Sequence, residues 1–355
     1  MSNIKEYFDS KRVSNSLLGT INNPRYIWLR EQGLIEDFDR PYFRIGSGID
    51  CLLTDPDRWD EEFAISEGNK PSGLLGKFVE ALPRYINSKD DISVYEDAYR
   101  VAGYKANIEN VIRWFWENES AVKYYKDRFL VESGKELLGR EEFEAIKYAV
   151  EVIKENEFTS FYFIPSEGEG NIERLFQQAI YFQIGEVECK GLLDGILINH
   201  DEKTIQPFDL KSTGKKVQEF PTSFTQFGYQ RQAAFYLLAL NSFLQNRSEY
   251  DTRDILNYTI LPFRFIVVES KPGHSPALIF QCSENDIECG LFGGYNKVTQ
   301  QYHKGIYELL EDYTWHKSTN QWLMPREAYQ NEGVLQLDVF YPFDYRKDRE
   351  YNQGY

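Results

Sequence analysis

Leu193-Asp194-Gly195 and Phe208-Asp209-Leu210-Lys211-Ser212-Thr213 form the stretch of sequence that decides the fold. Apolar and β-branched residues fill the segments around them, and turn-forming residues separate the two, which predicts strands in a meander over 179–184, 190–199 and 204–213. Side chains alternate along a strand, so Asp209 and Lys211 should point to the same face. A hairpin between the last two strands would bring Asp194 close to them. We therefore expect two carboxylates and one lysine in a single patch.

This combination of side chains suits the hydrolysis of phosphodiesters. Mg²⁺ prefers oxygen ligands and usually keeps several waters, so one or two carboxylates suffice when substrate phosphates complete its shell. A neighbouring lysine can orient water or offset charge that develops on phosphate. Taken alone, Asp209-x-Lys211 is more often a solvent-facing ion pair. Asp194 within an otherwise apolar strand, together with the helix downstream, favours a site for metal-assisted phosphodiester hydrolysis.

The rest of the chain reads as a mixture of helices and strands. Apolar residues at helical spacing predict helices at 14–18, 25–32, 49–53, 111–116, 143–153 and 224–245, and another helix over 283–310. Strand-like runs predict strands at 258–269 and 276–282. We expect an α/β (α+β) fold with a central mixed sheet flanked by helices. Its predicted parts are N-terminal helices that contribute to the core (1–63), a mostly helical insert (64–160), the core with the metal site (161–330) and a tail (331–355).

The spacing of these residues resembles a known superfamily of nucleases. Asp194, Asp209 and Lys211 match the signature of the PD-(D/E)xK nucleases. In the downstream helix, Gln232 and Tyr236 match the Gln-x-x-x-Tyr motif of the RecB-like branch, which includes RecE-like phage exonucleases. The resemblance implies a restriction-endonuclease-like core, Mg²⁺ as cofactor with Mn²⁺ able to substitute, and Asp194, Asp209 and Lys211 as catalytic residues.

Other segments extend this resemblance. They are Ser14-Asn15-Ser16 with Pro24, the helix Gly46 to Leu53 with Asp55-Pro56, Glu269 with Pro272, and Trp322-Leu323-Met324-Pro325. One departure matters, because Asp50 replaces the metal-binding His of the family's helix motif. Aspartate is also a hard oxygen ligand, so we expect a metal held by Asp50, Asp194 and Asp209. The alternative is that Asp50 is an ordinary charge on a helix surface.

Several residues around this set are candidates for binding the substrate. The resemblance assigns Gln232 and Tyr236, which lie on one helix face, to orienting the substrate backbone or the lysine. Arg231 is expected to contact phosphate. Lys215 and Lys216 are either phosphate contacts or solvated surface. Glu173, just before the first predicted strand, either supplies a further carboxylate or is exposed.

Charge and composition limit the function classes. The net charge of −16, from 40 basic and 56 acidic residues, repels nucleic acid at long range but does not describe a local groove. The four cysteines have no C-x-x-C spacing for an iron–sulfur cluster, the four histidines show no zinc spacing, and no phosphate-binding loop of an ATPase occurs. No apolar run approaches the ~18 residues of a membrane span, and no signal peptide is recognisable. These features predict a cytoplasmic protein, in the host cell if it is viral.

The sequence as a whole predicts a Mg²⁺-dependent DNA exonuclease, phage-encoded and acting in recombination, replication or repair. The resemblance further implies a homo-oligomeric ring and a single-strand annealing protein as partner. Two alternatives remain: a structure-specific endonuclease or end-trimming enzyme with the same site, and a non-catalytic DNA-binding scaffold subunit.

Overall fold

A computed structural model of the chain describes residues 2–35, 41–84, 86, 89–129, 135–271, 273, 275–335 and 337. The chain divides into two compact units, one of Met1–Asn15 with Asp37–Glu308 and the other of Ser16–Glu36 with Leu309–Tyr355. Pro272 and residues 338–355 of the predicted tail lie outside the described residues. The limits predicted for the four parts of the chain remain predictions.

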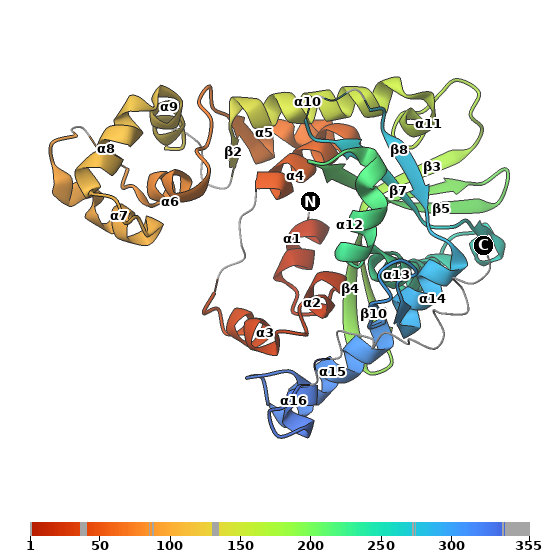
Figure 1. Cartoon of the computed structure of the whole chain (residues 1–355). Helices are drawn as coiled ribbons and strands as arrows, with labels where there is room; N and C mark the ends of the chain where they lie inside the picture. The colour runs from red at the N-terminus through yellow and green to blue at the C-terminus, as the bar shows by residue number, and fades with distance from the viewer. Residues whose placement is uncertain are drawn as a thin grey trace, which may run out of the picture. The chain divides into compact units, whose positions relative to one another are not determined.

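A six-stranded mixed sheet organises the larger unit (Figure 1). Its strands are β3 (Ile172–Ile184), β4 (Val187–Asn199), β5 (Thr204–Thr213), β6 (Thr259–Ile260), β7 (Arg264–Glu269) and β8 (Leu278–Gln281). The order is β3-β4-β5-β7-β8, and β6 pairs with β5. β3, β4 and β5 form the predicted antiparallel meander, while β5 and β7 run parallel. The expected mixed sheet is therefore confirmed.

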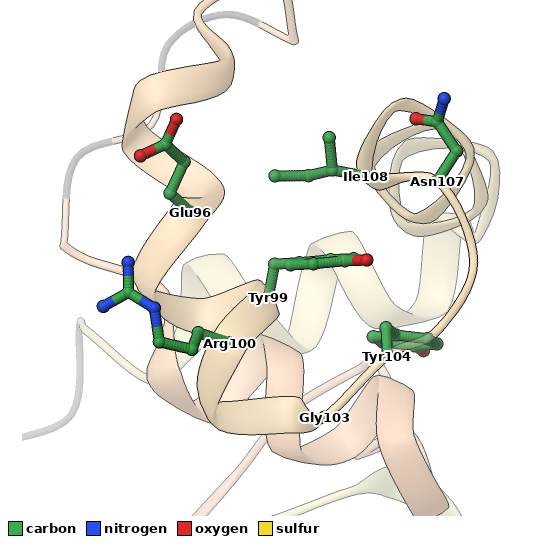
Figure 2. Close-up of a pocket in the computed structure, with 7 residues that line it drawn as sticks. All are labelled: Glu96, Tyr99, Arg100, Gly103, Tyr104, Asn107 and Ile108. Carbon is green, nitrogen blue, oxygen red and sulfur yellow. The ribbon is translucent and has the colours of Figure 1, made fainter.

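The segment predicted as an insert is mostly helical. Its elements are β1 (Phe63–Ile65), α6 (Gly73–Ala81), α7 (Glu96–Ala102), α8 (Ile108–Glu117), α9 (Glu119–Asp127), β2 (Glu136–Leu138), α10 (Arg140–Glu155) and α11 (Glu157–Ser160). Helices α6 to α9 enclose a core of their own, in which Phe78, Tyr95 and Phe115 are fully buried. An open pocket of about 660 Å³ lies at α7 and α8, where the rings of Tyr99 and Tyr104 stack (Figure 2). None of the predicted site residues lines it.

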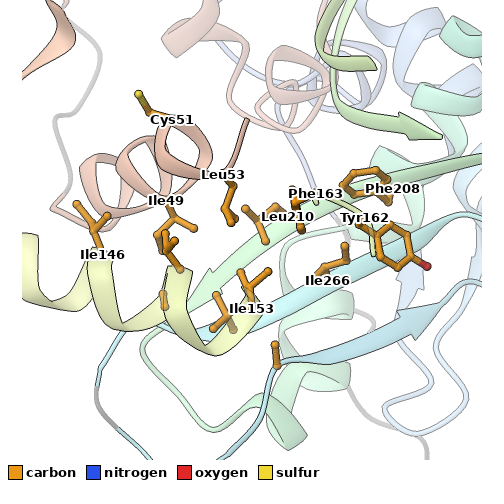
Figure 3. Packing of buried hydrophobic residues seen from close by; sticks show 14 of the residues in the cluster. Ile49, Cys51, Leu53, Ile146, Ile153, Tyr162, Phe163, Phe208, Leu210 and Ile266 are labelled. Atoms are coloured by element: carbon orange, nitrogen blue, oxygen red, sulfur yellow. The ribbon is translucent and has the colours of Figure 1, made fainter. Parts of the chain in front are cut away.

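Helices cover both faces of the sheet. α4 (Pro41–Thr54) and α10 pack on one face, where Ile49 and Ile146 meet Phe208 and Leu210 of β5 (Figure 3). α12 (Phe220–Gln226) and α13 (Tyr229–Ser248) supply the core on the other face, with Phe265 of β7. Because the two faces of β5 meet different cores, its alternating side chains are divided between them. The predicted fold class, a mixed sheet flanked by helices, is confirmed.

Three predicted elements are interrupted, each at a residue with a physical reason. The helix expected over 224–245 is broken at Gly228, which has a left-handed φ of 68°. The strand expected over 258–269 is split between β6 and β7 around Pro262, which has no N–H to donate to a ladder. The helix expected over 283–310 ends at Gly293, whose φ is 86°, and a short hairpin follows.

The remaining elements complete the chain. They are α1 (Ser2–Asp9), α2 (Asn15–Leu18), α3 (Pro24–Glu31), α5 (Trp59–Glu62), α14 (Glu284–Phe292), β9 (Gly294–Tyr295), β10 (Tyr302–His303), α15 (Ile306–Thr319) and α16 (Arg326–Gln330), with short 3₁₀ turns at Pro56–Arg58, Ile92–Tyr95, Val217–Glu219 and Ile255–Asn257. In the smaller unit Asn23 caps α3, and Trp322 stacks on the buried ring of His316. In the described part of the chain, the helices are too short or too polar to span a membrane.

Candidate active site

The predicted aspartates and lysine meet where β4 and β5 separate. The antiparallel ladder between these strands ends at the pair Gly195–Phe208. Asp194 precedes Gly195 in β4 and lies just beyond the end of this ladder. Its Oδ2 accepts a hydrogen bond from the backbone N–H of Leu210 at 2.9 Å. The carboxylate thus takes the place that a backbone carbonyl would hold in a continuing ladder. This bond fixes Asp194 at the point where the two strands part.

Asp209 and Lys211 lie side by side on the face of β5 that α13 covers. The Asp209 carboxylate is 1% exposed, and its Oδ2 lies 2.5 Å from Nζ of Lys211. Gln232 of α13 donates a hydrogen bond from Nε2 to the other oxygen, Oδ1, at 2.8 Å. The ammonium group of Lys211 also lies 4.9 Å from the centre of the Tyr229 ring. Oδ1 of Asp209 is therefore hydrogen-bonded, whereas the buried Oδ2 has the ion pair with Lys211 but no hydrogen bond of good geometry.

Asp50 approaches the same place from the C-terminal part of α4. Its Oδ1 is buried and has no hydrogen-bond partner. Burial raises the pKa of this carboxyl well above its ordinary value, and the charges of Asp194 and Asp209 raise it further. An unpaired buried polar atom is costly, which makes it a feature that calls for a ligand. The alternative of an ordinary surface charge does not fit these surroundings.

The site contains three acidic groups and one basic group, whose protonation depends on burial and on one another. Burial and the neighbouring Asp209 raise the pKa of Asp194 to about 7, and burial also raises the pKa of Asp209. Burial alone would lower the pKa of Lys211, but the charges of Asp209 and Asp194 outweigh it and raise that pKa. Lys211 therefore keeps its proton. The raised pKa values mean that these acids favour their protonated forms; if a bound cation displaced the protons, three carboxylates and one lysine would leave two negative charges for the cation to balance.

These residues fit a hydrated divalent cation better than a closed metal cage. Among the described residues, no group of three or more His, Cys, Asp or Glu side chains is arranged so that it could hold a metal ion. Mg²⁺ does not require such a group, because waters and substrate phosphates complete its shell. The unpartnered oxygen of Asp50, and the negative charge that the three acids would gain on losing their protons, are the features that suit it.

The helix α13 carries the other predicted residues. Tyr236 lies one turn beyond Gln232, and burial, followed by the charge of Asp209, raises its pKa well above the ordinary value. Arg231 donates from Nε to Oδ1 of Asn15 at 3.0 Å, so it has a partner within the chain, and burial lowers its pKa. Lys215 and Lys216 are exposed. Their contacts with phosphate, and that of Arg231, remain predictions.

Glu173 is neither a further ligand of this site nor an exposed residue. Its side chain is 29% exposed and accepts two hydrogen bonds from Arg247, at 3.0 and 2.7 Å, and a contact from His200 at 3.0 Å. Although burial opposes it, these hydrogen bonds lower the pKa of Glu173. The residue therefore belongs to an ion-pair network at the start of β3.

One residue that the sequence did not indicate faces Asp194. Gln177 lies in β3 between the ladder pairs Phe176–Gly195 and Gln178–Leu193, yet it forms no pair itself and has a φ of 47°. Its Nε2 lies 3.4 Å from Oδ1 of Asp194. A left-handed residue other than glycine within a strand is strained, and such strain is concentrated at functional sites. Nothing in the alternation of β3 marks this glutamine.

Comparisons with known proteins add little to this geometry. Neither the comparison with protein families nor that with curated proteins finds a relative of this chain. Solved structures do match, among them that of a protein from Eubacterium rectale described as "Putative exonuclease", with 12% identity and a TM-score of 0.45 over 96% of this chain and 93% of the other. A likeness of this degree does not establish a shared fold, so conclusions about the site depend on its own residues.

Proposed function

We propose that this protein is a metal-dependent nuclease that hydrolyses phosphodiester bonds in DNA. The observation that carries the proposal is the convergence of Asp194, Asp209 and Lys211 where β4 and β5 part, with an unpartnered oxygen of Asp50 nearby. Burying several acidic groups beside a protonated lysine costs folding free energy, so such a cluster indicates a site that binds a ligand. The motif order in the sequence, from Asp50 to Tyr236, supports the same reading.

Each residue has a role in this proposal. Because the three aspartates do not form a closed metal site among the described residues, Asp50, Asp194 and Asp209 would hold Mg²⁺, or Mn²⁺ in its place, together with waters and substrate phosphates. When bound, the ion supplies Lewis-acid activation of phosphate and water. Lys211 keeps its proton, so it acts as a cation that offsets charge developing on the phosphate rather than as a base. Gln232 fixes the Asp209 carboxylate through Oδ1. Tyr236 and Arg231 would position the substrate backbone.

The finer assignment is an exonuclease, phage-encoded and acting in recombination, replication or repair. Its support is the Gln-x-x-x-Tyr motif and the flanking segments that resemble RecE-like exonucleases. A homo-oligomeric ring and a single-strand annealing partner belong to the same proposal. An endonuclease or end-trimming enzyme would use the same residues, and a scaffold subunit would keep the fold without cleavage.

End-labelled linear duplex, single strand and closed circular DNA separate these possibilities. Each is incubated with the protein in Mg²⁺, in Mn²⁺ and in EDTA. An exonuclease should degrade linear DNA from its ends in either metal, leave circles intact and be inactive in EDTA. Cleavage of circles would indicate the endonuclease. Binding without cleavage of any substrate would contradict the nuclease proposal and favour the scaffold.

Substitution of Lys211 tests the site itself. Lys211→Ala should lower the cleavage rate about 10²–10³-fold, because it removes one fixed electrostatic contact to the reacting phosphate. Lys211→Arg is the control for loss of the buried ion pair with Asp209, because it keeps the positive charge while changing the geometry of the cationic group. Glu188→Gln, which changes an exposed acid on β4, is the matched control and should leave the rate unchanged. A folded Lys211→Ala variant with the wild-type rate would disprove the assignment.

A further inference from the structure

Gln177 of β3 combines an unusual backbone with a position directly opposite a predicted metal ligand. The β3–β4 ladder keeps one register on either side of it, through the pairs Phe176–Gly195 and Gln178–Leu193. That register sets Gln177 opposite Asp194, although the two form no ladder pair themselves. The φ of Gln177 is 47°, in the left-handed region that residues other than glycine rarely adopt. Within β3, the residue that departs from strand geometry is therefore the one that faces Asp194.

The pairing of the sheet does not explain this backbone. β3 is an edge strand, and among the described strands it pairs with β4 alone. An inserted residue would produce a local bulge, but the register is the same on both sides of Gln177. Strained backbone of this kind is concentrated at functional sites. The contacts of the Gln177 side chain are therefore the place to look for its cause.

The amide of Gln177 faces the oxygen of Asp194 that β5 does not contact. Oδ2 of Asp194 accepts the backbone N–H of Leu210 at 2.9 Å, whereas Oδ1 lies 3.4 Å from Nε2 of Gln177. Each oxygen thus has a donor, and the carboxylate is oriented from both neighbouring strands. A carboxylate oxygen has two lone-pair sites, so Oδ1 can accept the amide hydrogen and still coordinate a cation.

Asp209 has support of the same kind from a different element. Gln232 of α13 donates from Nε2 to Oδ1 of Asp209 at 2.8 Å. Two glutamines, one from β3 and one from α13, thus direct their amides to the two aspartates of the strand pair. Burial is the main influence on the pKa of Asp194 and raises it, while the hydrogen bond from Gln177 opposes that rise because it favours the carboxylate. Side chains that hydrogen-bond to metal ligands in this way orient them and strengthen metal binding.

We propose that Gln177 is a positioning residue that directs Oδ1 of Asp194 toward the divalent cation. This inference rests on the proposed nuclease function and adds to its metal site a residue that the sequence motifs do not contain. In this role the left-handed backbone has a purpose, since it accompanies the approach of the amide to Asp194. If Gln177 served the strand alone, its replacement would change stability and leave the affinity for metal as it is.

Calorimetric titration of Mn²⁺ into the whole chain without DNA, combined with urea denaturation, tests the proposal. Gln177→Met keeps the size of the side chain and removes the donor, and Gln177→Gly also adopts the left-handed backbone without strain. Both variants should bind Mn²⁺ about 10–100-fold more weakly than the wild type. The midpoint of urea denaturation for Gln177→Gly should be no lower than that of the wild type. Gln183→Met, at an exposed position of the same strand, is the matched control and should keep the wild-type affinity.

The outcomes separate this inference from the proposed function. Wild-type Mn²⁺ affinity in a folded Gln177→Met variant would overturn the positioning role even if the chain cleaves DNA. A Gln177→Gly variant that is less stable but binds Mn²⁺ normally would make the residue structural and also overturn it. Weaker Mn²⁺ binding by both variants of a chain that never cleaves DNA would support the role of Gln177 and contradict only the nuclease proposal. A wild-type chain that takes up no Mn²⁺ would overturn the inference together with the metal dependence.

Discussion

Lys211 illustrates how neighbours decide the chemistry of a single side chain. Burial favours its neutral form, but Asp209 at 2.5 Å and the nearby Asp194 favour the cation more strongly. The two carboxylates therefore favour the charged form of this lysine. Gln232 completes the arrangement, because it occupies the oxygen of Asp209 that the lysine does not contact.

Asp50 is where metal use can be tested at the level of one residue. Asp50→Ala should raise the Mg²⁺ or Mn²⁺ concentration needed for half-maximal activity by at least about 10–100-fold, because a ligand of the ion is lost. Asp50→His, which restores the residue type of the RecB-like motif, should recover part of that loss. The measurement is a titration of activity against each metal.

Asp57→Ala provides the control for that titration, since it removes an exposed acid that follows α4. An unchanged metal requirement in a folded Asp50→Ala variant would return Asp50 to the role of a structural charge. Calorimetric titration of Mn²⁺ into the same variants gives a second readout that does not depend on catalysis.

The sequence predicted the chemistry of these residues better than their contacts. Strand alternation and hairpin pairing depend on local spacing, so the approach of Asp194, Asp209 and Lys211 followed from it. The position of Gln177 did not, because its left-handed backbone depends on how β3 adapts to β4. Glu173 was left open for the same reason, since its partner Arg247 is distant in sequence.

At the scale of elements, the site depends on the way β4 leaves β5. Gly195 is the β4 residue at which pairing with β5 ends, and the Phe208 ring occupies the space that a side chain there would need. Phe208 is fully buried between the sheet and the helices on its α4 face. Because residue 195 has no side chain, the Phe208 ring can lie across β4 just before β4 and β5 separate.

Gly195→Ala should destabilise the protein by about 1–3 kcal/mol, because a methyl group would overpack against the Phe208 ring. Chemical denaturation measures the free energy of unfolding. Gly214→Ala is the matched control, since a Cβ at that position meets no atom within 4 Å. A Gly195→Ala variant as stable as the control would show that the strand can shift away from the ring without cost.

An ion pair attaches the connection before the sheet to β3. Arg174 donates to both oxygens of Glu169, at 2.6 and 2.7 Å, and also to the backbone carbonyl of Phe161 at 2.9 Å. The hydrogen bonds from Arg174 lower the pKa of Glu169 to about 2, despite partial burial. The stabilisation is thus present above the ordinary pKa of about 4.5 and is lost as the pH falls through about 2.

Glu169→Gln should therefore reduce the free energy of unfolding by about 2 kcal/mol at pH 7. The difference from the wild-type protein should shrink as the pH is lowered from about 4.5 towards 2. Denaturation curves at several pH values measure it, with Glu167→Gln, at an exposed neighbouring acid, as the control. A difference that does not change with pH would show that the charge of Glu169 is not what stabilises this connection.

Elements were predicted where periodicity is strong and misjudged where one residue interrupts it. The strand over 204–213 was predicted at the limits that β5 has, because both ends carry turn-forming residues. Gly228 and Gly293 break helices whose apolar spacing continues across them, and only tertiary packing shows which glycines adopt a left-handed φ. The cores on the two faces of the sheet were also beyond prediction, since periodicity does not reveal which helix covers which face.

At the scale of the whole molecule, the proposed function requires the chain to bind a polyanion while carrying a net charge of −16. Repulsion at long range is screened over about 8–10 Å at physiological ionic strength, so local charge decides binding. Lys211 lies in the site, the exposed Lys215 and Lys216 follow the end of β5, and the guanidinium of Arg231 already contacts Asn15. Local cations, including a bound metal, are therefore expected to supply most of the attraction.

Divalent metal should accordingly strengthen the binding of DNA. Without metal, the ionised fraction of Asp50, Asp194 and Asp209 repels phosphate at the site itself, and a bound divalent cation would make that local charge positive. Affinity for a short DNA is measured in Ca²⁺, which should permit docking with little cleavage, and in EDTA at the same ionic strength. Binding should be tighter in Ca²⁺, and Asp209→Asn should narrow the difference. Each phosphate that is neutralised contributes roughly −0.9 to the slope of log affinity against log salt on duplex DNA, so Lys215→Ala combined with Lys216→Ala should make that slope shallower. Equal affinity in Ca²⁺ and EDTA would contradict the inversion of charge, because the excess of carboxylates would then have no influence on the substrate.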